Sequence, residues 1–258
     1  MSEARIIAVA NQKGGVGKTT TAVNLGASLA ELGHSVVVID LDPQGNASTG
    51  LGVPPEAREV NSFDLLLGEM AFSDSIQSTE IENLRIVPSS SDLAAADLQL
   101  ASIPGRTQLL RKKLRASSEA SYILIDCPPA LGLLTVNAMV AADSVLVPLQ
   151  AEFYALEGLS QLLMTVREVR QGANPDLRIE GVLLTMADNR NNLSQQVEAD
   201  ARATLSDLVY STVIPRNVRL SEAPSHAMPV LSYDSTSKGS GAYRALAREF
   251  LSRQLVSV

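Results

Sequence analysis

The amino-acid sequence predicts an α/β protein with a doubly wound, mainly parallel sheet flanked by helices. Short segments rich in β-branched residues alternate with longer helical patterns, and several strand segments are apolar almost throughout. Strands that helices cover on both faces have this composition, and right-handed crossovers connect such strands into one parallel sheet. The 258 residues contain no internal repeat and no linker rich in proline, glycine or serine, so we predict one domain over residues 1–258.

Seven apolar, β-branched runs are the expected strands. In chain order they are Arg5–Ala10, Ser35–Asp40, Leu84–Pro88, Tyr122–Asp126, Ser144–Pro148, Ile179–Thr185 and Val209–Ile214. The helical patterns between them cover Thr19–Glu31, Arg106–Arg115, Leu134–Ala142, Leu156–Gln171, Leu193–Leu208 and Ala242–Leu255. The least regular stretch, Gly45–Ser91, is expected at the edge of the fold. Because ligands of such sheets bind beyond the carboxyl ends of the strands, the loops after the strands are the candidate functional segments.

The composition excludes several classes of protein. Hydrophobic residues make up 45% and charged residues 19% of the chain, which is typical of a globular protein. No apolar run reaches the roughly 18 residues that cross a bilayer, and no signal peptide opens the sequence, so we expect a cytoplasmic protein. Cys127 is the single cysteine, so an internal disulfide and a cysteine zinc site are excluded. The net charge of −7 argues against a generally basic nucleic-acid binder, though not against a local basic patch. The aromatic content of 3% argues against a base-stacking surface for single strands.

A glycine-rich loop lies between the first expected strand and the first expected helix. It reads Asn11-Gln12-Lys13-Gly14-Gly15-Val16-Gly17-Lys18-Thr19-Thr20. Glycines let the backbone N–H groups of such a loop point at phosphate oxygens, and the following helix adds the partial positive charge of its N-terminus. Lys18 is expected to bind the β- and γ-phosphates and the Thr19 hydroxyl to ligate Mg²⁺. The loop therefore predicts a site for ATP and Mg²⁺.

Two aspartates, Asp40 and Asp126, end expected strands, and Asp42 follows the first of them. Asp40 and Asp42 are two residues apart, so in an extended chain their side chains project to the same side. A carboxylate beside the phosphates can orient the attacking water or hold Mg²⁺ through water. Asp126 ends an apolar strand, which is the Walker B arrangement that presents one carboxylate to the Mg²⁺ shell. We therefore expect Thr19 and Asp126 around the metal, with Asp40 and Asp42 as the carboxylates that orient the attacking water or hold Mg²⁺ through water.

The glycine-rich loop departs from the ordinary motif at two positions. Gln12 stands where a glycine is expected, and Lys13 adds a second lysine before Gly14. The loop resembles the deviant Walker A motif of the ParA/MinD ATPases. Residues 148–158 and 212–225 are similar to the corresponding segments of chromosomal ParA proteins, also called Soj. The resemblance covers essentially the whole chain and implies the P-loop NTPase fold of the deviant Walker A type.

The resemblance also implies roles for single residues. In the family the extra lysine, here Lys13, reaches across a dimer interface to the nucleotide of the partner subunit. Asp42 is implied to position the attacking water, with Asp40 as a supporting group near the metal. Pro215 and Asn217 lie in a Pro-Arg-Asn turn that contacts the adenine base in relatives. The implied catalytic residues are Lys13, Lys18 and Asp42, and the implied nucleotide contacts run from Lys13 to Thr20 with Pro215 and Asn217.

Three branches of the superfamily are excluded by features of this sequence. The nitrogenase iron protein needs cysteines to bridge its cluster, and Cys127 alone cannot supply them. MinD carries a basic amphipathic membrane helix at its C-terminus, whereas residues 248–256 contain too few basic residues for stable membrane anchoring. Operator-binding plasmid ParA proteins carry an extra N-terminal DNA-reading domain, which we expect this protein to lack.

The resemblance thus implies a partition ATPase of the ParA/Soj type, cytoplasmic and associated with the nucleoid. Its implied partners are a second subunit in the ATP state, double-stranded DNA bound without sequence preference, and a ParB-like centromere-binding protein that stimulates hydrolysis. Residues 216–253 hold six basic and three acidic residues, which makes this segment the candidate anion-facing surface. The candidate DNA contacts are Arg190, Arg216, Arg219, Lys238 and Arg244. By resemblance Arg190 and Arg219 lead, while Arg216 has the nucleotide as an alternative partner.

Two alternative functions stay open at this stage. A cargo-positioning relative would use the same cycle of ATP and DNA binding to place a protein assembly, and the sequence barely separates it from a partition ATPase. A P-loop metabolic ligase, similar to dethiobiotin synthase, would need a substrate pocket and would bind no DNA. Lys13 argues against the ligase, because by resemblance this lysine is useful only across a dimer.

Overall fold

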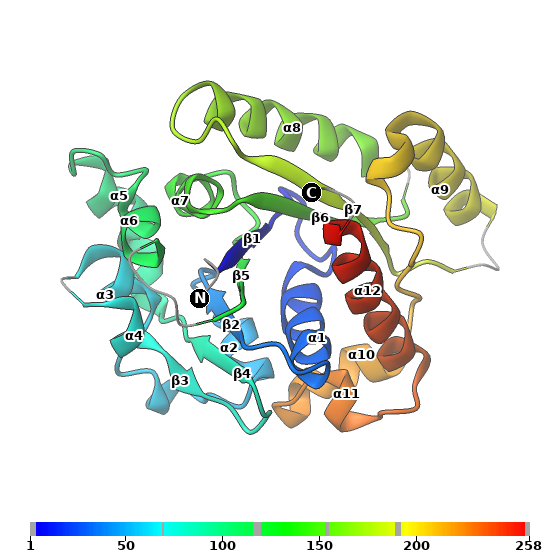
Figure 1. The fold of residues 1–258 in the computed structure, drawn as a ribbon, viewed down its shortest axis with the longest axis horizontal. Helices are drawn as coiled ribbons and strands as arrows, with labels where there is room; N and C mark the ends of the chain where they lie inside the picture. Colours follow the sequence, from blue (N-terminus) through cyan, green and yellow to red (C-terminus); the bar gives the residue numbers. More distant parts are fainter. Residues whose placement is uncertain (1–3, 69, 116–119, 153–154, 189–191, 256–258) are drawn as a thin grey trace.

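The computed structural model describes residues 4–68, 70–115, 120–152, 155–188 and 192–255. At the centre of these residues lies a seven-stranded sheet in the order β3-β4-β2-β5-β1-β6-β7 (Figure 1). The strands are β1 (Arg5–Val9), β2 (Val36–Asp40), β3 (Gln77–Ser78), β4 (Leu84–Val87), β5 (Tyr122–Asp126), β6 (Ser144–Gln150) and β7 (Arg178–Thr185). Neighbouring strands are parallel except β3 and β4, so the predicted α/β fold with a mainly parallel sheet is confirmed.

Helices cover both faces of the sheet (Figure 1). They are α1 (Lys18–Glu31), α2 (Asn46–Gly50), α3 (Ser62–Leu67), α4 (Phe72–Ser75), α5 (Ala96–Ala101), α6 (Leu109–Leu114), α7 (Leu133–Ala141), α8 (Ala155–Gln171), α9 (Asn192–Leu205), α10 (Val218–Glu222), α11 (Val230–Tyr233) and α12 (Lys238–Leu255). Four short 3-10 turns, η1 (Pro55–Ala57), η2 (Ser91–Ala95), η3 (Ser206–Leu208) and η4 (Ala223–His226), complete the described elements. In the described part of the chain, no helix combines the length and apolar character that a membrane span needs.

The apolar strands divide the interior into two cores. Along β2, Val36 and Val38 belong to the core that α1 and α12 cover, whereas Val37 and Ile39 belong to the core that α6 and α7 cover. Successive side chains of a strand point to opposite faces, so a strand buried on both faces must be apolar throughout. Because β1 and β2 each pair in parallel with β5, the carboxyl ends of these three strands lie along the same side of the sheet. The glycine-rich loop follows β1 on this side, which we call the carboxyl edge.

The expected strand Val209–Ile214 is a wrong prediction. Among the described residues this segment forms no continuous ladder: Val209 makes one isolated parallel bridge with Val182, and the N–H groups of Tyr210 and Ile214 donate to the carbonyls of Val182 and Leu184, each at 2.9 Å. The backbone N–H groups of Ser211 and Thr212 donate instead to the carboxylate of Glu249 on α12, each at 2.7 Å. Because a side chain takes these donors, the pairing with β7 is interrupted between Tyr210 and Ile214, and no strand forms despite the β-branched sequence.

Other differences concern boundaries. The expected helix Arg106–Arg115 is shorter, since α6 covers Leu109–Leu114, and α12 begins at Lys238 rather than Ala242. The short α10, α11 and β3 have no counterpart among the expected elements. The stretch Gly45–Ser91 does supply the outer strands β3 and β4, as expected for the edge of the fold.

Candidate functional site

The glycine-rich loop joins the end of β1 to the start of α1. Gly15 and Gly17 adopt φ values of 72° and 86°, in the left-handed region that side chains disfavour. Gly17 is the N-cap of α1, and no side chain of the described residues caps this helix. The first turn therefore keeps backbone N–H groups for an anion, which the helix dipole also attracts. On the far side, the Thr185 hydroxyl ties the loop to β7 by donating to the carbonyl of Val16 at 2.9 Å.

Lys18 is buried at the first position of α1, with 6% of its surface exposed. Its Nζ donates to the carbonyl of Lys13 at 3.0 Å, so the side chain curls back over the loop. Burial lowers the pKa of Lys18, and the carboxylates of Asp126 and Asp42 oppose this effect. A buried ammonium of this kind gains stability when a phosphate anion replaces its lost hydration.

Asp126 lies at the end of β5 with no exposed surface. Within the described residues, neither of its carboxylate oxygens has a hydrogen-bond partner of normal geometry. Burial raises the pKa of Asp126 well above its ordinary value, the neighbouring Asp40 raises it further, and the nearby Thr19 hydroxyl opposes the increase. A buried carboxylate without donors, beside a threonine hydroxyl, fits Mg²⁺, which takes few protein oxygens together with those of phosphates.

Asp40 is also fully buried but has partners. One oxygen accepts hydrogen bonds from the backbone N–H and the hydroxyl of Ser48, at 2.8 and 2.7 Å, and the other accepts from the N–H of Asp42 at 3.1 Å. Burial raises the pKa of Asp40 to about 6 in spite of these donors. Because protein donors engage both oxygens, the geometry favours support of the loop after β2 over direct metal ligation.

Asp42 is half-buried in the loop after β2. Its Oδ1 accepts a hydrogen bond from the N–H of Gln44 at 3.0 Å, which fixes the direction of the carboxylate. Asp42 lies near enough to Lys18 for its charge to raise the pKa of that ammonium, against the effect of burial. The structure therefore brings together Asp42, Lys18, Thr19 and Asp126, as the strand-end argument predicts.

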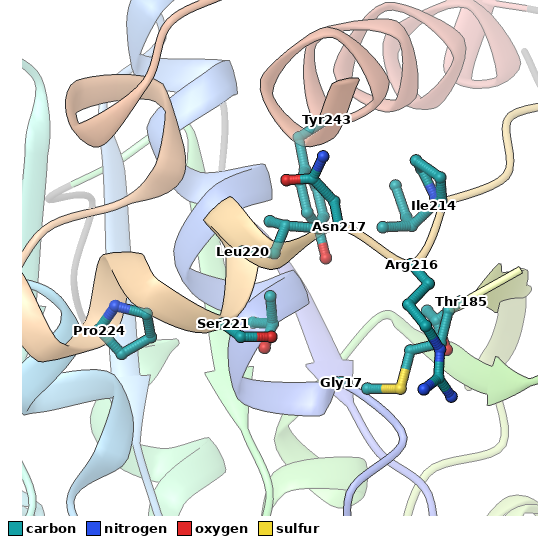
Figure 2. A pocket seen from close by; sticks show the side chains of 12 residues that line it. Gly17, Thr185, Ile214, Arg216, Asn217, Leu220, Ser221, Pro224 and Tyr243 are labelled. Atoms are coloured by element: carbon teal, nitrogen blue, oxygen red, sulfur yellow. The ribbon is translucent and has the colours of Figure 1, made fainter. Parts of the chain in front are cut away.

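A cavity of about 290 Å³ adjoins the loop (Figure 2). Pro215 and Asn217 line it, as expected of residues that face the base. Arg216 lines it too, on the side of Gly17, which favours the nucleotide as its partner. The remaining lining residues are Thr20, Thr185, Met186, Ile214, Leu220, Ser221, Pro224 and Tyr243.

Sequence reasoning missed several of these cavity residues. Thr185 ends a strand and could have been found by the strand-end rule. Tyr243 had no local signal, because it comes from α12 and reaches the site only through packing, where its hydroxyl lies 3.3 Å from that of Thr21. The cavity is thus built from segments that are far apart in the chain.

Lys13 and Gly14 are exposed at the mouth of the loop. The Lys13 ammonium forms an ion pair with Glu152 at 2.8 Å, in which both side chains are more than 40% exposed. An exposed pair of this kind is worth about 0–1 kcal/mol, so it restrains Lys13 only weakly. Among the described residues, a Cβ atom at Gly14 would meet only the Cβ of Pro129, at 4.0 Å, so this part of the subunit has room for a side chain there.

The candidate DNA-binding residues differ in their location and in the groups that they contact. Arg190 lies outside the described residues. Arg216, Arg219 and Lys238 line one surface hollow. Within it, Arg219 forms ion pairs with Glu222 at 2.8 Å and with Asp234 at 3.3 Å.

Arg244 is engaged by an acidic residue of another helix. Two of its nitrogens donate to the carboxylate of Glu31 on α1, at 2.7 and 2.8 Å. In one subunit, Arg216, Arg219 and Lys238 therefore lie together. Arg244 instead links α12 to α1 through its contact with Glu31.

Comparisons with known proteins identify the family of this chain. A family model described as an AAA domain matches residues 4–179. The chromosome partitioning protein ParA of Caulobacter vibrioides is 54% identical over 253 residues, which cover 97% of this chain and 95% of that protein. The sporulation initiation inhibitor protein Soj of Bacillus subtilis is 53% identical over 246 residues, or 95% of this chain and 97% of that protein.

A solved structure shows the same fold. Cobyrinic acid a,c-diamide synthase from Mycobacterium smegmatis, with bound ADP and magnesium, has a TM-score of 0.85 and 37% identity, covering 99% of this chain and 97% of that chain. The fold and the glycine-rich loop define a P-loop ATPase of the deviant Walker A type. With about half of its residues shared over nearly the full length of the curated relatives, the chain belongs to the ParA/Soj family of chromosome-partitioning ATPases.

Proposed function

We propose that this ATPase binds ATP with Mg²⁺ at the carboxyl edge of the sheet and closes into a face-to-face dimer. The observation that carries the proposal is the burial of Lys18 and Asp126 beside the uncapped N-terminus of α1. Each has lost hydration that a triphosphate and its metal ion would replace. The related M. smegmatis structure, which holds ADP and magnesium, supports this assignment.

Each residue of the site has a distinct role in the proposal. Lys18 donates to the phosphate oxygens, and the backbone N–H groups of residues 14–20 surround them. Thr19 and Asp126 hold Mg²⁺, which when bound neutralises charge on the phosphates. Asp42, whose direction Gln44 fixes, orients the attacking water toward the γ-phosphate. Pro215 and Asn217 contact the base from the cavity beside Gly17.

Dimer formation in the proposal depends on Lys13 and Gly14. Lys13 exchanges its exposed ion pair with Glu152 for the phosphates of the partner's nucleotide, an exchange that loses little because the pair is weak. Gly14 lies in the interface, where a side chain would separate the loops of the two subunits. ATP thereby controls the oligomeric state.

The ATP dimer binds double-stranded DNA without sequence preference. A protein with a net charge of −7 holds DNA where basic groups of both subunits converge, so the dimer doubles each phosphate contact. The hollow that contains Arg216, Arg219 and Lys238 is the described part of this surface. A ParB-like protein then stimulates hydrolysis and releases the dimer from the DNA. The cycle takes place in the cytoplasm, on the nucleoid.

A second candidate function is a small-molecule ligase. The similarity to cobyrinic acid a,c-diamide synthase favours it, because that protein's name is that of a metabolic enzyme. The partition function has the stronger support, since the chromosome partitioning protein ParA of C. vibrioides is 54% identical to this chain and the synthase is 37% identical. A ligase needs no DNA and no ATP-driven dimer, so the two functions predict different behaviour with nucleotide alone.

Light scattering after size exclusion separates the two functions. We expect a monomer without nucleotide or with ADP, and a dimer of twice the mass with ATP and Mg²⁺. The Lys13→Ala variant should stay monomeric with ATP. An oligomeric state that is identical with ATP and with ADP would contradict the proposed ATP-driven dimer.

A further inference from the structure

The backbone of Asp42 is held on both sides. Its N–H donates to Oδ1 of Asp40 at 3.1 Å. Its carbonyl accepts a hydrogen bond from the hydroxyl of Ser89 at 2.5 Å and another from the N–H of Gly45 at 2.9 Å. With the carboxylate itself fixed by the N–H of Gln44, each polar part of Asp42 except Oδ2 has a defined donor or acceptor.

Ser89 closes a ring of hydrogen bonds that contains Asp42. Its own N–H donates to the hydroxyl of Ser48 at 2.9 Å, and this hydroxyl donates to Oδ2 of Asp40 at 2.7 Å. The ring therefore runs from Asp42 through Asp40, Ser48 and Ser89 and back to the carbonyl of Asp42. Asp40, Ser48 and Ser89 have no exposed surface, so water does not compete for these bonds.

Ser89 comes from outside the expected catalytic segments. It follows β4, which ends at Val87 near the edge of the sheet, and no phosphate-binding or metal-binding motif includes it. Arg58 supports it from the other side, donating through Nη1 to the carbonyl of Ser89 at 3.4 Å and through Nη2 to the hydroxyl of Thr49 at 2.8 Å. A Cβ atom at Gly45 would lie 2.1 Å from Nη1 of Arg58, so the loop packs directly on this support.

We propose that Ser89 is a positioning residue for ATP hydrolysis, acting through Asp42. The inference rests on the proposed role of Asp42 in orienting the attacking water. A hydrolytic carboxylate must be held close to its productive position, because small displacements lower the rate strongly. Ser89 supplies a restraint on Asp42 from the segment after β4. Its loss removes one of the two hydrogen bonds to the carbonyl of Asp42, leaves the bond from Gly45, and does not touch the phosphate site.

Ser75 provides a matched control. Like Ser89 it has no exposed surface and donates its hydroxyl to a backbone carbonyl, that of Phe72 at 2.8 Å. Ser75 belongs to α4 and takes no part in the ring. Alanine at either position removes one buried hydroxyl, so the two variants lose similar stability but differ in their connection to Asp42.

The test is phosphate release measured over a range of ATP concentrations at saturating Mg²⁺. We expect Ser89→Ala to lower kcat about fivefold or more while KM for ATP stays within about twofold, since binding and orientation are separable. Ser75→Ala should keep the parent kcat. Ser48→Ala opens the same ring at another bond and should reproduce the loss of kcat, which provides a second variant if Ser89→Ala folds poorly.

The link through Asp42 is tested in the Asp42→Ala background. There Ser89→Ala should cause no further loss of the residual turnover, because the group that it positions is gone. Folded Ser89→Ala and Ser48→Ala proteins with parental kcat would overturn the inference, as would an equal loss of kcat in Ser75→Ala. If Asp42→Ala itself turned over normally, the proposed function of Asp42 would fail, which is a different result from a silent Ser89.

Discussion

Asp40 and Asp126 occupy paired positions in the parallel register of β2 and β5, and both carboxyl groups are fully buried. Burial raises the pKa of each, and the charge of Asp40 raises that of Asp126 further. The folded chain then retains protons that the unfolded chain releases. Their contribution to stability is largest below the ordinary carboxyl pKa and is lost as the pH rises through the folded pKa values. At neutral pH the nucleotide-free site is therefore destabilising, and the proposed Mg²⁺ would offset this.

The first prediction removes one of the two charges. Asp126→Asn should raise the Tm of the nucleotide-free protein by about 2–4 °C at pH 8, because an amide does not ionise in the buried site. The gain should be smaller at pH 5, where the native carboxyl keeps more of its proton. Circular dichroism melts at the two pH values measure this, and the variant should also lose the Mg²⁺ dependence of ATP binding. A Tm at pH 8 equal to or below that of the parent would contradict the account.

Lys18 should be required for nucleotide binding. Lys18→Ala removes the ammonium that neutralises the phosphates in a partly desolvated site, so we expect no measurable ATP binding by calorimetry. Its Tm without nucleotide should stay close to that of the parent, because the lost ammonium was poorly solvated. Lys13→Ala, with its exposed side chain, is the control and should still bind ATP. If Lys18→Ala bound ATP with micromolar affinity, a group other than Lys18 would have to bind the phosphates.

Gly14 should matter only between subunits. In the described part of the chain, a Cβ atom there has no neighbour closer than 4.0 Å, so Gly14→Val should fold and bind ATP like the parent. In the dimer the valine should hold the two loops apart, and light scattering with ATP and Mg²⁺ should detect a monomer. A parental fraction of dimer would place Gly14 outside the interface.

Asp42→Ala should separate binding from hydrolysis. The phosphate contacts of Lys18 remain, whereas the orientation of the attacking water is lost, so we expect kcat to fall about 10²-fold or more. The ATP dimer should then persist, which stopped-flow release of a fluorescent ATP analogue and light scattering can follow. Normal phosphate release would transfer the catalytic role to another carboxylate.

The DNA surface should depend on Arg219. Arg219→Glu reverses a charge beside Glu222 and Asp234 in both subunits, so it should nearly abolish DNA binding at physiological salt. Dimer formation with ATP should continue. Arg178→Glu makes the same charge reversal at the amino end of β7, whereas the site lies at the carboxyl ends of the strands. This control variant should bind DNA normally. A mobility shift over a salt series measures both, and an unchanged shift in Arg219→Glu would exclude this residue.

The sequence predicted the parts of the fold and site that depend on local patterns. The apolar runs of β1, β2 and β5 and the loop before Lys18 are contiguous signals, and the structure has them where they were expected. Val209–Ile214 failed because Glu249, far along the chain, captures the backbone donors of Ser211 and Thr212. Tyr243 was missed for the same reason, since only the packing of α12 brings it to the cavity.

The ring around Asp42 could not have been predicted either. Ser48 and Ser89 are ordinary serines in sequence, 41 residues apart, and only the parallel pairing of β2 with β4 brings them into contact. Local patterns therefore identify the groups that meet the nucleotide, whereas the groups that hold them in position emerge from the tertiary structure.

Co-sedimentation with plasmid DNA tests the central claim most directly. The parent protein should sediment with DNA when ATP and Mg²⁺ are present and remain in the supernatant with ADP or without nucleotide. Lys18→Ala should remain in the supernatant under every condition, and Asp42→Ala should stay on the DNA after the parent has been released. Equal sedimentation with ATP and ADP, or none with ATP, would contradict an ATP-controlled dimer that binds DNA.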